Sequence, residues 1–235
     1  MAGKYRYYSN ILTSTILSLI LFLLFSFCYI GTASGIQNSS LEITETQLTQ
    51  ANPFWNLAIY EDRVVWSDVS NWDIYMYDIS TSKKTQITKD GANQWHSAIY
   101  GDRLVWDDDR NGNWDIYMYN LSTSNKTQIT ENESHQTCPV IYGDIIAWQD
   151  YRAGKEYENP DIFIYDLSTN KEAQVAAGKA LQEYPAIYKD RIIWMDGRNG
   201  GSLDKYGQFT GNWDIYMYNL STFRESQITT NESAQ

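Results

Sequence analysis

The string GNWDIYMYNLST stands at Gly112–Thr123 and returns, letter for letter, at Gly211–Thr222. The two copies lie too far apart in the chain to be parts of one small structural element. Long-range repetition of this kind is the signature of a repeat architecture, in which one supersecondary unit is used several times. The rest of the sequence should therefore contain weaker copies of the same unit.

Four segments of the chain carry the same landmarks in the same order. Each has an Ile-Tyr pair, then a tryptophan, then Asp-Ile followed by an aromatic residue, and finally a glutamine with a β-branched neighbour. In the second segment these landmarks are Ile99-Tyr100, Trp106, Asp115-Ile116-Tyr117 and Gln128-Ile129. The sequence therefore predicts four repeats, with bounds at about 52–93, 94–134, 135–180 and 181–235.

Each repeat is expected to contain four short strands, which in the second repeat hold AIY, RLVW, DIYMYN and TQIT. Turn signals separate them, among them Gly101-Asp102 and Asn111-Gly112. The third strand is apolar on both faces, because Ile116 and Met118 alternate with Tyr117 and Tyr119. A sheet covered on both faces favours an all-β, β-propeller-type array of four four-stranded blades over a β-sandwich, whose strands alternate in polarity.

This pattern resembles the TolB-type β-propeller repeat, in which a segment like DRNGNWDIYMYN joins the second and third strands. The resemblance covers about residues 41–235, and it is most similar to repeat arrays in secreted surface proteins of archaea. It implies a binding platform. Related blades also form substrate-gating domains of serine peptidases, and some similar propellers are lyases.

The two ends of the array do not match each other. The segment Glu45–Gln50, ETQLTQ, matches a fourth strand without a repeat before it, so residues 36–50 are assigned as a linker with a spare blade strand. Four blades are few for this family, in which six to eight are expected. We expect an open or self-associating array, because exposed blade faces are costly in water, with a tight four-bladed ring as the alternative.

Residues 1–35 differ from the rest. Lys4 and Arg6 precede an uncharged, largely apolar run over 11–31, and small residues follow it at Thr32–Gly35. This order is typical of a secretory signal peptide, and the run is also long enough for an uncleaved N-terminal membrane anchor helix. In either case the body of the protein is expected to be secreted or to lie at the cell surface, with membrane contact only through residues 11–31.

The composition limits the partners. The chain has a formal net charge of −11, and the predicted leader carries two basic and no acidic side chains, so the body is more acidic still. Such a surface excludes a nucleic-acid backbone as partner. Cys138 is the only cysteine outside the leader, so no internal disulfide is available. We interpret it as a buried thiol at the start of a strand.

Only one loop changes length between repeats. It runs from the aspartate two residues after the tryptophan to the aspartate of Asp-Ile, and it grows from Asp68–Asp73 in the first repeat to Asp196–Asp214 in the fourth. A scaffold that lengthens one loop is presenting it for recognition. Neutral drift in a tolerant loop is the alternative. The candidate binding residues in the two long loops are Tyr151, Arg152, Tyr157, Glu158, Asp204, Lys205, Tyr206 and Phe209.

Carboxylates form a candidate metal site in the second repeat. Asp107, Asp109 and Asn111 form the first half of a calcium-binding loop, but Met118 stands where the bidentate acid is expected. The alternative is a hairpin turn whose Asp and Asn side chains cap their own backbone. The aspartates that recur in every repeat are expected to hold turns and to pair with Arg110, Arg152 and Arg198. Apart from calcium, no cofactor is expected.

The sequence predicts no enzyme. The only histidines, His96 and His135, occupy different repeat positions, and no Gly-x-Ser-x-Gly motif is present. Six sequons provide candidate glycosylation sites: Asn38, Asn120, Asn125, Asn132, Asn219 and Asn231. We expect a non-catalytic exported scaffold that binds a protein or a surface glycan. The alternatives are an envelope component that associates through blade edges and, less favoured, a hydrolase-associated or lyase propeller.

Overall fold

The structure is a computed structural model that describes residues 45–48, 50–51, 53–154, 159–178, 180–200, 202–203 and 209–230. The chain divides into two units, Met1–Glu45 and Thr46–Gln235, and the described residues belong almost wholly to the second. The predicted leader over 1–35, its helix and most of the linker lie outside the described residues. No helix in the described ranges is long and apolar enough to cross a membrane.

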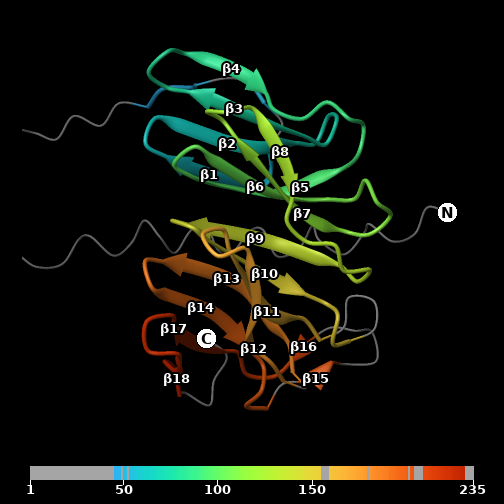
Figure 1. Cartoon of the computed structure of the whole chain (residues 1–235), viewed down its shortest axis with the longest axis vertical. Coiled ribbons are helices and arrows are strands. Elements are labelled where there is room, and N and C mark those ends of the chain that lie inside the picture. The colour runs from blue at the N-terminus through green and yellow to red at the C-terminus, as the bar shows by residue number, and fades with distance from the viewer. Residues whose placement is uncertain are drawn as a thin grey trace, which may run out of the picture. The chain divides into compact units, whose positions relative to one another are not determined.

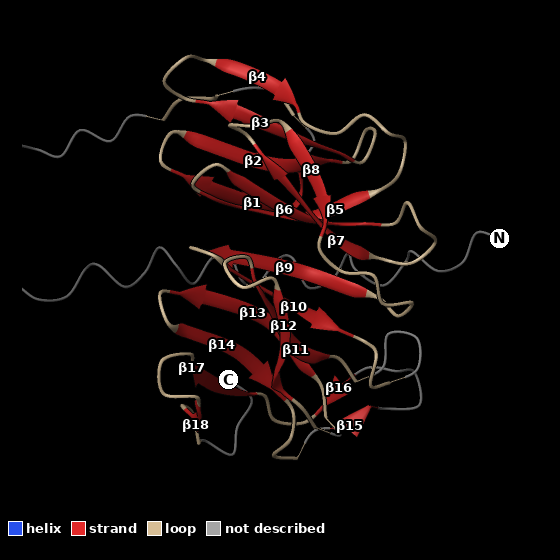
Figure 2. Cartoon of the chain, viewed as in Figure 1, coloured by secondary structure: helices blue, strands red, loops and turns tan. Residues whose placement is uncertain are grey.

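Residues 46–235 form four four-stranded antiparallel sheets, and the described part contains strands and loops but no helix (Figures 1 and 2). The first sheet is β1 (Pro53–Tyr60), β2 (Arg63–Asp68), β3 (Asp73–Asp78) and β4 (Lys83–Gln86). The second is β5 (Gln94–Tyr100), β6 (Arg103–Asp108), β7 (Asp115–Asn120) and β8 (Asn125–Gln128). The predicted four-stranded repeat is confirmed.

The third sheet is β9 (Gln136–Tyr142), β10 (Ile145–Asp150), β11 (Asp161–Asp166) and β12 (Lys171–Ala176). The fourth is β13 (Gln182–Tyr188), β14 (Arg191–Asp196), β17 (Asp214–Asn219) and β18 (Arg224–Gln227). Between β14 and β17 the longest loop contains a two-stranded ribbon, β15 (Ser202–Leu203) and β16 (Phe209–Thr210). Within every sheet the strands pair in chain order.

Two-residue turns join the first and second strands of each sheet. The first turn residue has a positive φ in all four sheets: 51° at Glu61, 56° at Gly101, 59° at Gly143 and 54° at Lys189. Turns of this kind match the twist of the flanking strands and favour glycine at that position. The turn geometry is therefore shared even where the glycine is not.

The four landmark tryptophans form the centre of each sheet and are almost fully buried. Each indole N–H donates to the aspartate two residues later, as in Trp106 Nε1 to Asp108 Oδ2 at 3.0 Å and Trp148 Nε1 to Asp150 Oδ2 at 3.0 Å. A buried indole needs such an acceptor, because an unpaired polar group in the core is costly. This pairing explains why the two residues recur together.

Successive sheets pack face to face: β1 contacts β5, β5 contacts β9, and β9 contacts β13. The second and third sheets, for example, join through Val105 and Ile116 on one side and Ile146, Trp148 and Phe163 on the other. No comparable set of contacts joins the first sheet to the fourth in the described part of the chain. Within the described residues the four sheets therefore form an open array and not a closed four-bladed ring.

The segment predicted as a spare strand is only partly described, since residue 49 lies outside the described residues. Residues 45–48 and 50 adopt no strand. Leu48 and Ala51 instead lie beside the first sheet, where they line an apolar hollow with Leu57, Val64 and Trp66. A fourth strand needs the edge of a third strand to pair with, and the edge of β3 is already taken by β4.

Candidate functional site

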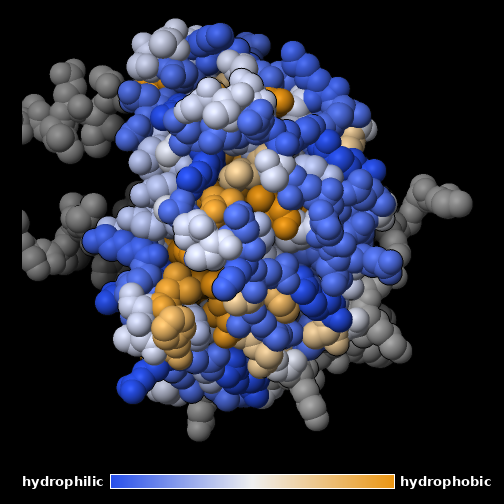
Figure 3. All heavy atoms as spheres, in the orientation of Figure 1, coloured by the Kyte–Doolittle hydropathy of each residue, from blue (hydrophilic) through white to orange (hydrophobic). Residues whose placement is uncertain are grey.

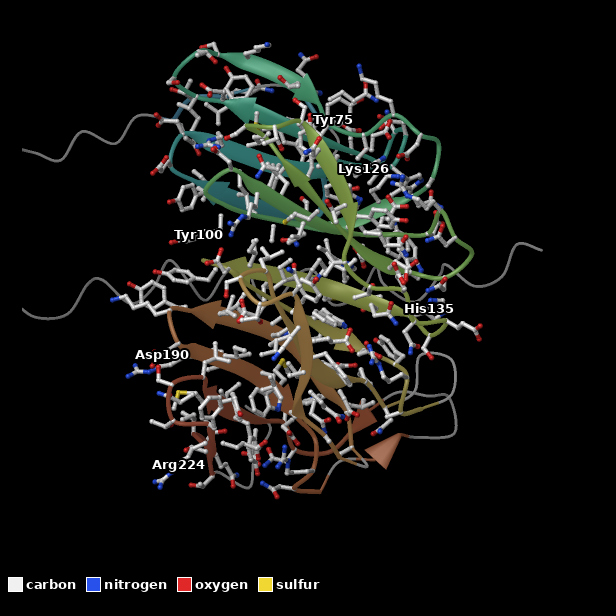
Figure 4. All side chains as sticks on the ribbon, viewed as in Figure 1. Tyr75, Tyr100, Lys126, His135, Asp190 and Arg224 are labelled. Atoms are coloured by element: carbon white, nitrogen blue, oxygen red, sulfur yellow. The ribbon has the colours of Figure 1, made fainter. Side chains whose placement is uncertain are left out.

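The loops between the second and third strands all leave their sheets from the same pair of positions. In each sheet two aspartates face each other at the end of the ladder: Asp68 and Asp73, Asp108 and Asp115, Asp150 and Asp161, Asp196 and Asp214. We call the edge of the array that carries these loops the loop rim, and the opposite edge, which carries the turns between first and second strands, the turn rim. Figure 4 shows His135 toward the loop rim, and Tyr100 and Asp190 on the turn rim.

Repeated side chains hold the base of each loop. Arg152 forms a bidentate pair with Asp150, with Nε to Oδ1 at 2.8 Å and Nη2 to Oδ2 at 2.6 Å. Its guanidinium also lies over the Phe163 ring, 4.1 Å from the centroid. Arg110 and Arg198 do the same with Asp108 and Asp196, as expected from the sequence. These recurring charges support the loops and are not free for a ligand.

The predicted binding residues fall into two groups. Tyr151 is buried, and burial raises the pKa of its phenol. Arg152 is held by Asp150 and Glu172. These two therefore support the rim from beneath, because the residues next to the ladder turn inward. Tyr157, Glu158, Asp204, Lys205 and Tyr206 lie outside the described residues, and Phe209 is described only as part of the β16 backbone.

The predicted calcium residues make separate contacts. Asp107 pairs with His96, Asp109 accepts from the side chain of Asn93 at 2.6 Å, and Asn111 donates to Asp115 at 2.9 Å. No group of three or more His, Cys, Asp or Glu side chains in the described ranges is placed to hold a metal ion. Asn111 thus bonds within the hairpin, as the alternative prediction has it, whereas Asp107 and Asp109 bond to the preceding strand and loop.

Four of the predicted glycosylation residues lie in the described ranges. The side-chain oxygens of Asn120 and Asn219 each accept two backbone N–H groups in the turn that follows. Asn132 caps Ser134 in the same way, and Asn125 is exposed at the start of β8. Asn38 and Asn231 lie outside the described residues. The turn-capping role accounts for the repetition of Asn120 and Asn219 without glycosylation.

A row of side chains that the sequence analysis missed lies on the first strands, beside the loop rim. In β5, β9 and β13 the register shifts near His96, Cys138 and Tyr184, and these three residues have φ values of 38°, 55° and 52°. A bulge re-aims a side chain, and a positive φ outside glycine is uncommon. The backbone feature is thus repeated in the second, third and fourth sheets, while the side chain that it presents differs in each of them. We call this set, with Asp107 and Glu183, the bulge row.

His96 is the charged member of the bulge row. Its Nδ1 lies 2.8 Å from Oδ2 of Asp107, whose side chain is fully buried. Burial lowers the pKa of His96, but the charge and hydrogen bond of Asp107, with a smaller contribution from Cys138, raise it to about 11. His96 is therefore held as an imidazolium beside a half-buried thiol, Cys138. The thiol is less buried than the sequence suggested, because the bulge turns it out of the sheet.

The fourth sheet contributes a second ionisable group. Burial raises the pKa of the Glu183 carboxyl to about 7. The neighbouring Tyr184 is exposed, and its backbone N–H donates to Gln149 Oε1 at 3.1 Å, which joins the third and fourth sheets. The imidazolium thus lies in the second sheet, the thiol in the third, and the acid and the phenol together in the fourth.

Three tryptophans lie at the loop-rim side of the first two sheets. Trp95 lies between Trp72 and Trp114, with ring centroids at 5.7 Å and 4.4 Å, and its ring also meets His96 edge-on at 6.2 Å. Large aromatic side chains of this kind are enriched where proteins recognise ligands. The signal in the sequence for the bulge row was variation at one position of an otherwise constant repeat. His96, Cys138 and Tyr184 occupy one repeat position, as do Asp107, Gln149 and Met195.

Comparisons with solved structures identify the class of fold. No family model matches the sequence, and no curated protein matches it. Among solved structures, TolB from Acinetobacter baumannii is 15% identical with a TM-score of 0.57, over 81% of this chain and 46% of that one. A nidogen/laminin complex gives 10% identity and a TM-score of 0.51, over 72% of this chain and 60% of that one. A puromycin hydrolase gives 13% identity and a TM-score of 0.54, over 73% of this chain and 27% of that one.

These likenesses define the class of protein: the chain has the fold of TolB-like and other β-propellers. It spans less than two thirds of the length of each of these neighbours. At such low identity the likeness concerns the fold alone, and the neighbours include peptidases as well as TolB. The function has to come from the loop rim and the bulge row.

Proposed function

We propose that this chain is a non-catalytic, exported scaffold that binds a protein or a surface glycan through its loop rim. The observation that supports this best is the unequal length of the four loops on identical ladder ends. The ladder closes on facing aspartates in every sheet, yet the connection grows from Asp68–Asp73 to Asp196–Asp214. Binding residues are commonly carried on loops that a rigid scaffold holds in place.

The chemistry of the rim fits recognition. The loops of the third and fourth repeats combine aromatic and charged residues, including Tyr157, Glu158, Lys205 and Tyr206. The bulge row adds His96 and the exposed Tyr184 on the same side of the array. Aromatic residues with mixed charges are typical of interaction surfaces. Export is inferred from the basic, apolar and small-residue order over residues 1–35.

The way the acids are used supports a non-catalytic role. A catalytic carboxylate occurs once in a site, whereas the aspartates of this chain recur in every sheet. Asp108, Asp150 and Asp196 each accept a tryptophan N–H and pair with an arginine. Their recurrence and their partners match a structural function, which leaves the unequal loops as the part that distinguishes one repeat from another.

The test is a loop graft. Residues 197–213 are replaced by the sequence of residues 109–114, so that the fourth sheet receives the shorter loop of the second sheet. The aspartates that bound both loops face each other in the same register, and the graft keeps an arginine and an asparagine at the positions of Arg198 and Asn199. The fold is therefore expected to survive the change, as far-UV circular dichroism will show.

Binding is measured with the fluorescently labelled chain on isolated cell envelopes from the source organism. The parent chain should bind saturably, and the graft should bind at least tenfold more weakly. Phe223→Asp, an exposed position in the β17–β18 turn on the turn rim, is the matched control and should bind like the parent. Protease or periodate treatment of the envelopes distinguishes a protein from a glycan partner. Undiminished binding by the graft would refute the proposal.

A further inference from the structure

The two outer faces of the array are built from the same repeat positions that pack against each other between neighbouring sheets inside it. Within the array, each sheet uses one face, the trailing face, against the next sheet and the other, the leading face, against the preceding sheet. In the second interface Val105 and Ile116 form the trailing side, and Ile141 and Ile146 the leading side. The first sheet has no neighbour on its leading face, and the fourth has none on its trailing face, within the described part of the chain.

The leading face of the first sheet is apolar and exposed. Ile59 is 65% exposed, whereas the residues at its repeat position, Ile99 and Ile141, are each 7% exposed. Leu57 is 61% exposed on the same strand. The hollow lined by Leu48, Val64 and Trp66 also opens on this side, and Leu48 covers only part of it.

The trailing face of the fourth sheet is its counterpart. Ile193 is 40% exposed, whereas Val65, Val105 and Ala147 at the same repeat position are 0% exposed. Tyr188 is 62% exposed and Ile228 is 53% exposed. Figure 3 shows apolar side chains reaching the surface over the region of β9, β13 and β14, framed by hydrophilic ones. Large apolar residues left exposed in this pattern mark an interaction surface.

An arginine at the start of the second strand bonds to the turn of the next sheet at the first two interfaces, and Ile145 takes its place at the third. Arg63 of the first sheet donates to the Gly101 carbonyl at 3.1 Å and to Asp102 at 2.7 Å in the next turn. Arg103 repeats this with Gly143 and Asp144 at 2.9 and 2.6 Å. Arg191 holds this position in the fourth sheet, and its side chain is 64% exposed. The matching turn on the leading side of the array is Glu61–Asp62.

A row of tyrosines also crosses the array from the first sheet to the fourth. Tyr60, Tyr100, Tyr142 and Tyr188 stand at one repeat position, with successive ring centroids 5.0, 4.6 and 5.2 Å apart. Tyr188 ends the row on the trailing side, and Tyr60 begins it on the leading side. A second copy placed behind the fourth sheet would bring its own Tyr60 against Tyr188.

We propose that a second copy of this chain docks head to tail, with the trailing face of one copy on the leading face of the other. Ile193 would pack against the Ile59 face, Arg191 would bond the Glu61–Asp62 turn, and Ile228 would enter the hollow, which requires Leu48 to shift. An interface between two different surfaces either closes into a ring or grows into a filament. Each copy has four blades. Two copies together therefore close one ring of twice that number through two equal interfaces. This inference does not rest on the proposed function.

Sedimentation velocity tests the proposal with two single variants. Ile193→Asp blocks the trailing face, and Ile59→Asp blocks the leading face. The parent chain should sediment at twice the mass of the denatured chain, and each variant alone should be a monomer. An equimolar mixture should regain a dimer, because the trailing face of Ile59→Asp and the leading face of Ile193→Asp are both intact. Phe223→Asp, equally an exposed apolar residue changed to aspartate, should remain dimeric.

A charge exchange gives a second test that leaves the apolar faces unchanged. Arg191→Glu should weaken the dimer at least tenfold, and Arg191→Glu combined with Asp62→Arg in the same chain should restore it. A parent chain that stays monomeric would overturn the proposal. So would a dimer of either aspartate variant alone, which indicates like faces pairing, or a mixture that stays monomeric while both variants melt like the parent.

Discussion

The aspartate two residues after each buried tryptophan accepts the indole N–H of that tryptophan, and in three of the four sheets it also pairs with the arginine two residues later. Asp150 accepts the indole N–H of Trp148 and pairs bidentately with Arg152, and its side chain is fully buried. A carboxylate so deep in the protein is stable only because both oxygens are bonded. The repetition of this residue in all four sheets is therefore a requirement of the tryptophan core.

Removing that carboxylate should be severe. We expect Asp150→Ala to lower the free energy of unfolding by about 3 kcal/mol, because it leaves the Trp148 N–H and the Arg152 charge without their acceptor. Urea unfolding followed by tryptophan fluorescence measures the loss. Asp166→Ala, at the end of β11 where the carboxylate accepts the Ser168 N–H of the following turn, is the control and should cost well under half as much. Equal losses for the two variants would contradict the assigned function of Asp150.

Glu183 should make stability depend on pH. Burial raises its folded-state pKa from 4.5 to about 7, so between these values the folded chain binds more protons than the unfolded chain. Stability from this group therefore falls as pH rises through that window. Glu183→Gln should match the parent below pH 4.5 and be more stable at pH 8, as measured by urea unfolding at each pH. A gain of the same size at both pH values would rule out titration of Glu183 as its cause.

At the scale of the strand and turn, repetition made the fold predictable. The four copies of Ile-Tyr, Trp and Asp-Ile-aromatic located the first three strands of each sheet, and the Gln with a β-branched neighbour located the fourth, because a shared landmark marks the same step of each ladder. The fourth-strand pattern over Glu45–Gln50 did not give a strand in the described residues, since a matching pattern does not supply a partner strand. The bulge row was also not predicted. A bulge is set by backbone pairing, and His96, Cys138 and Tyr184 share no side-chain property that would mark it.

Loop residues were predictable as a set but not one by one. The growing loop identified the rim, yet Tyr151 lies beneath it, because its backbone N–H bonds the His135 carbonyl at 2.9 Å and its hydroxyl accepts from Gln149 at 3.3 Å. Residues next to a ladder continue its alternation for a step or two before the chain turns outward. The candidates nearest the ladder were therefore the ones placed inward.

The turn between the first and second strands allows the effect of backbone strain on stability to be predicted without any side-chain contact. Gly143 has a φ of +59°, and a Cβ added there would meet nothing within 4 Å. Gly143→Lys should therefore cost about 1 kcal/mol through backbone strain, and Lys189→Gly at the equivalent turn should gain up to about 1 kcal/mol. Chemical denaturation measures both. Shifts of the same sign in the two variants would be inconsistent with a shared turn geometry.

For the whole molecule, the sequence indicated an array of four units but left its closure open. Closure depends on the angle between sheets and on what lies beyond the first and fourth, neither of which a single repeat encodes. The structure shows an open array with Ile59 and Ile193 exposed at its two ends. Repeated residues hold the sheets together, and the residues that differ between repeats lie at the loop rim.

Calcium should leave the thermal stability of the whole molecule unchanged. Asp107, Asp109 and Asn111 each bond a different protein partner, so no shared cage is available to a cation. We expect the same melting temperature in millimolar calcium and in excess chelator, by differential scanning calorimetry. A rise of several degrees with calcium would show that these oxygens converge in solution.

The most direct test of the central claim, that four equivalent sheets stacked on one another make up the body, is amide hydrogen exchange followed by mass spectrometry. The account predicts protected segments at the second and third strands of all four repeats: β2 and β3, β6 and β7, β10 and β11, and β14 and β17. Protection missing from any one of these pairs under conditions where the others are protected would contradict it.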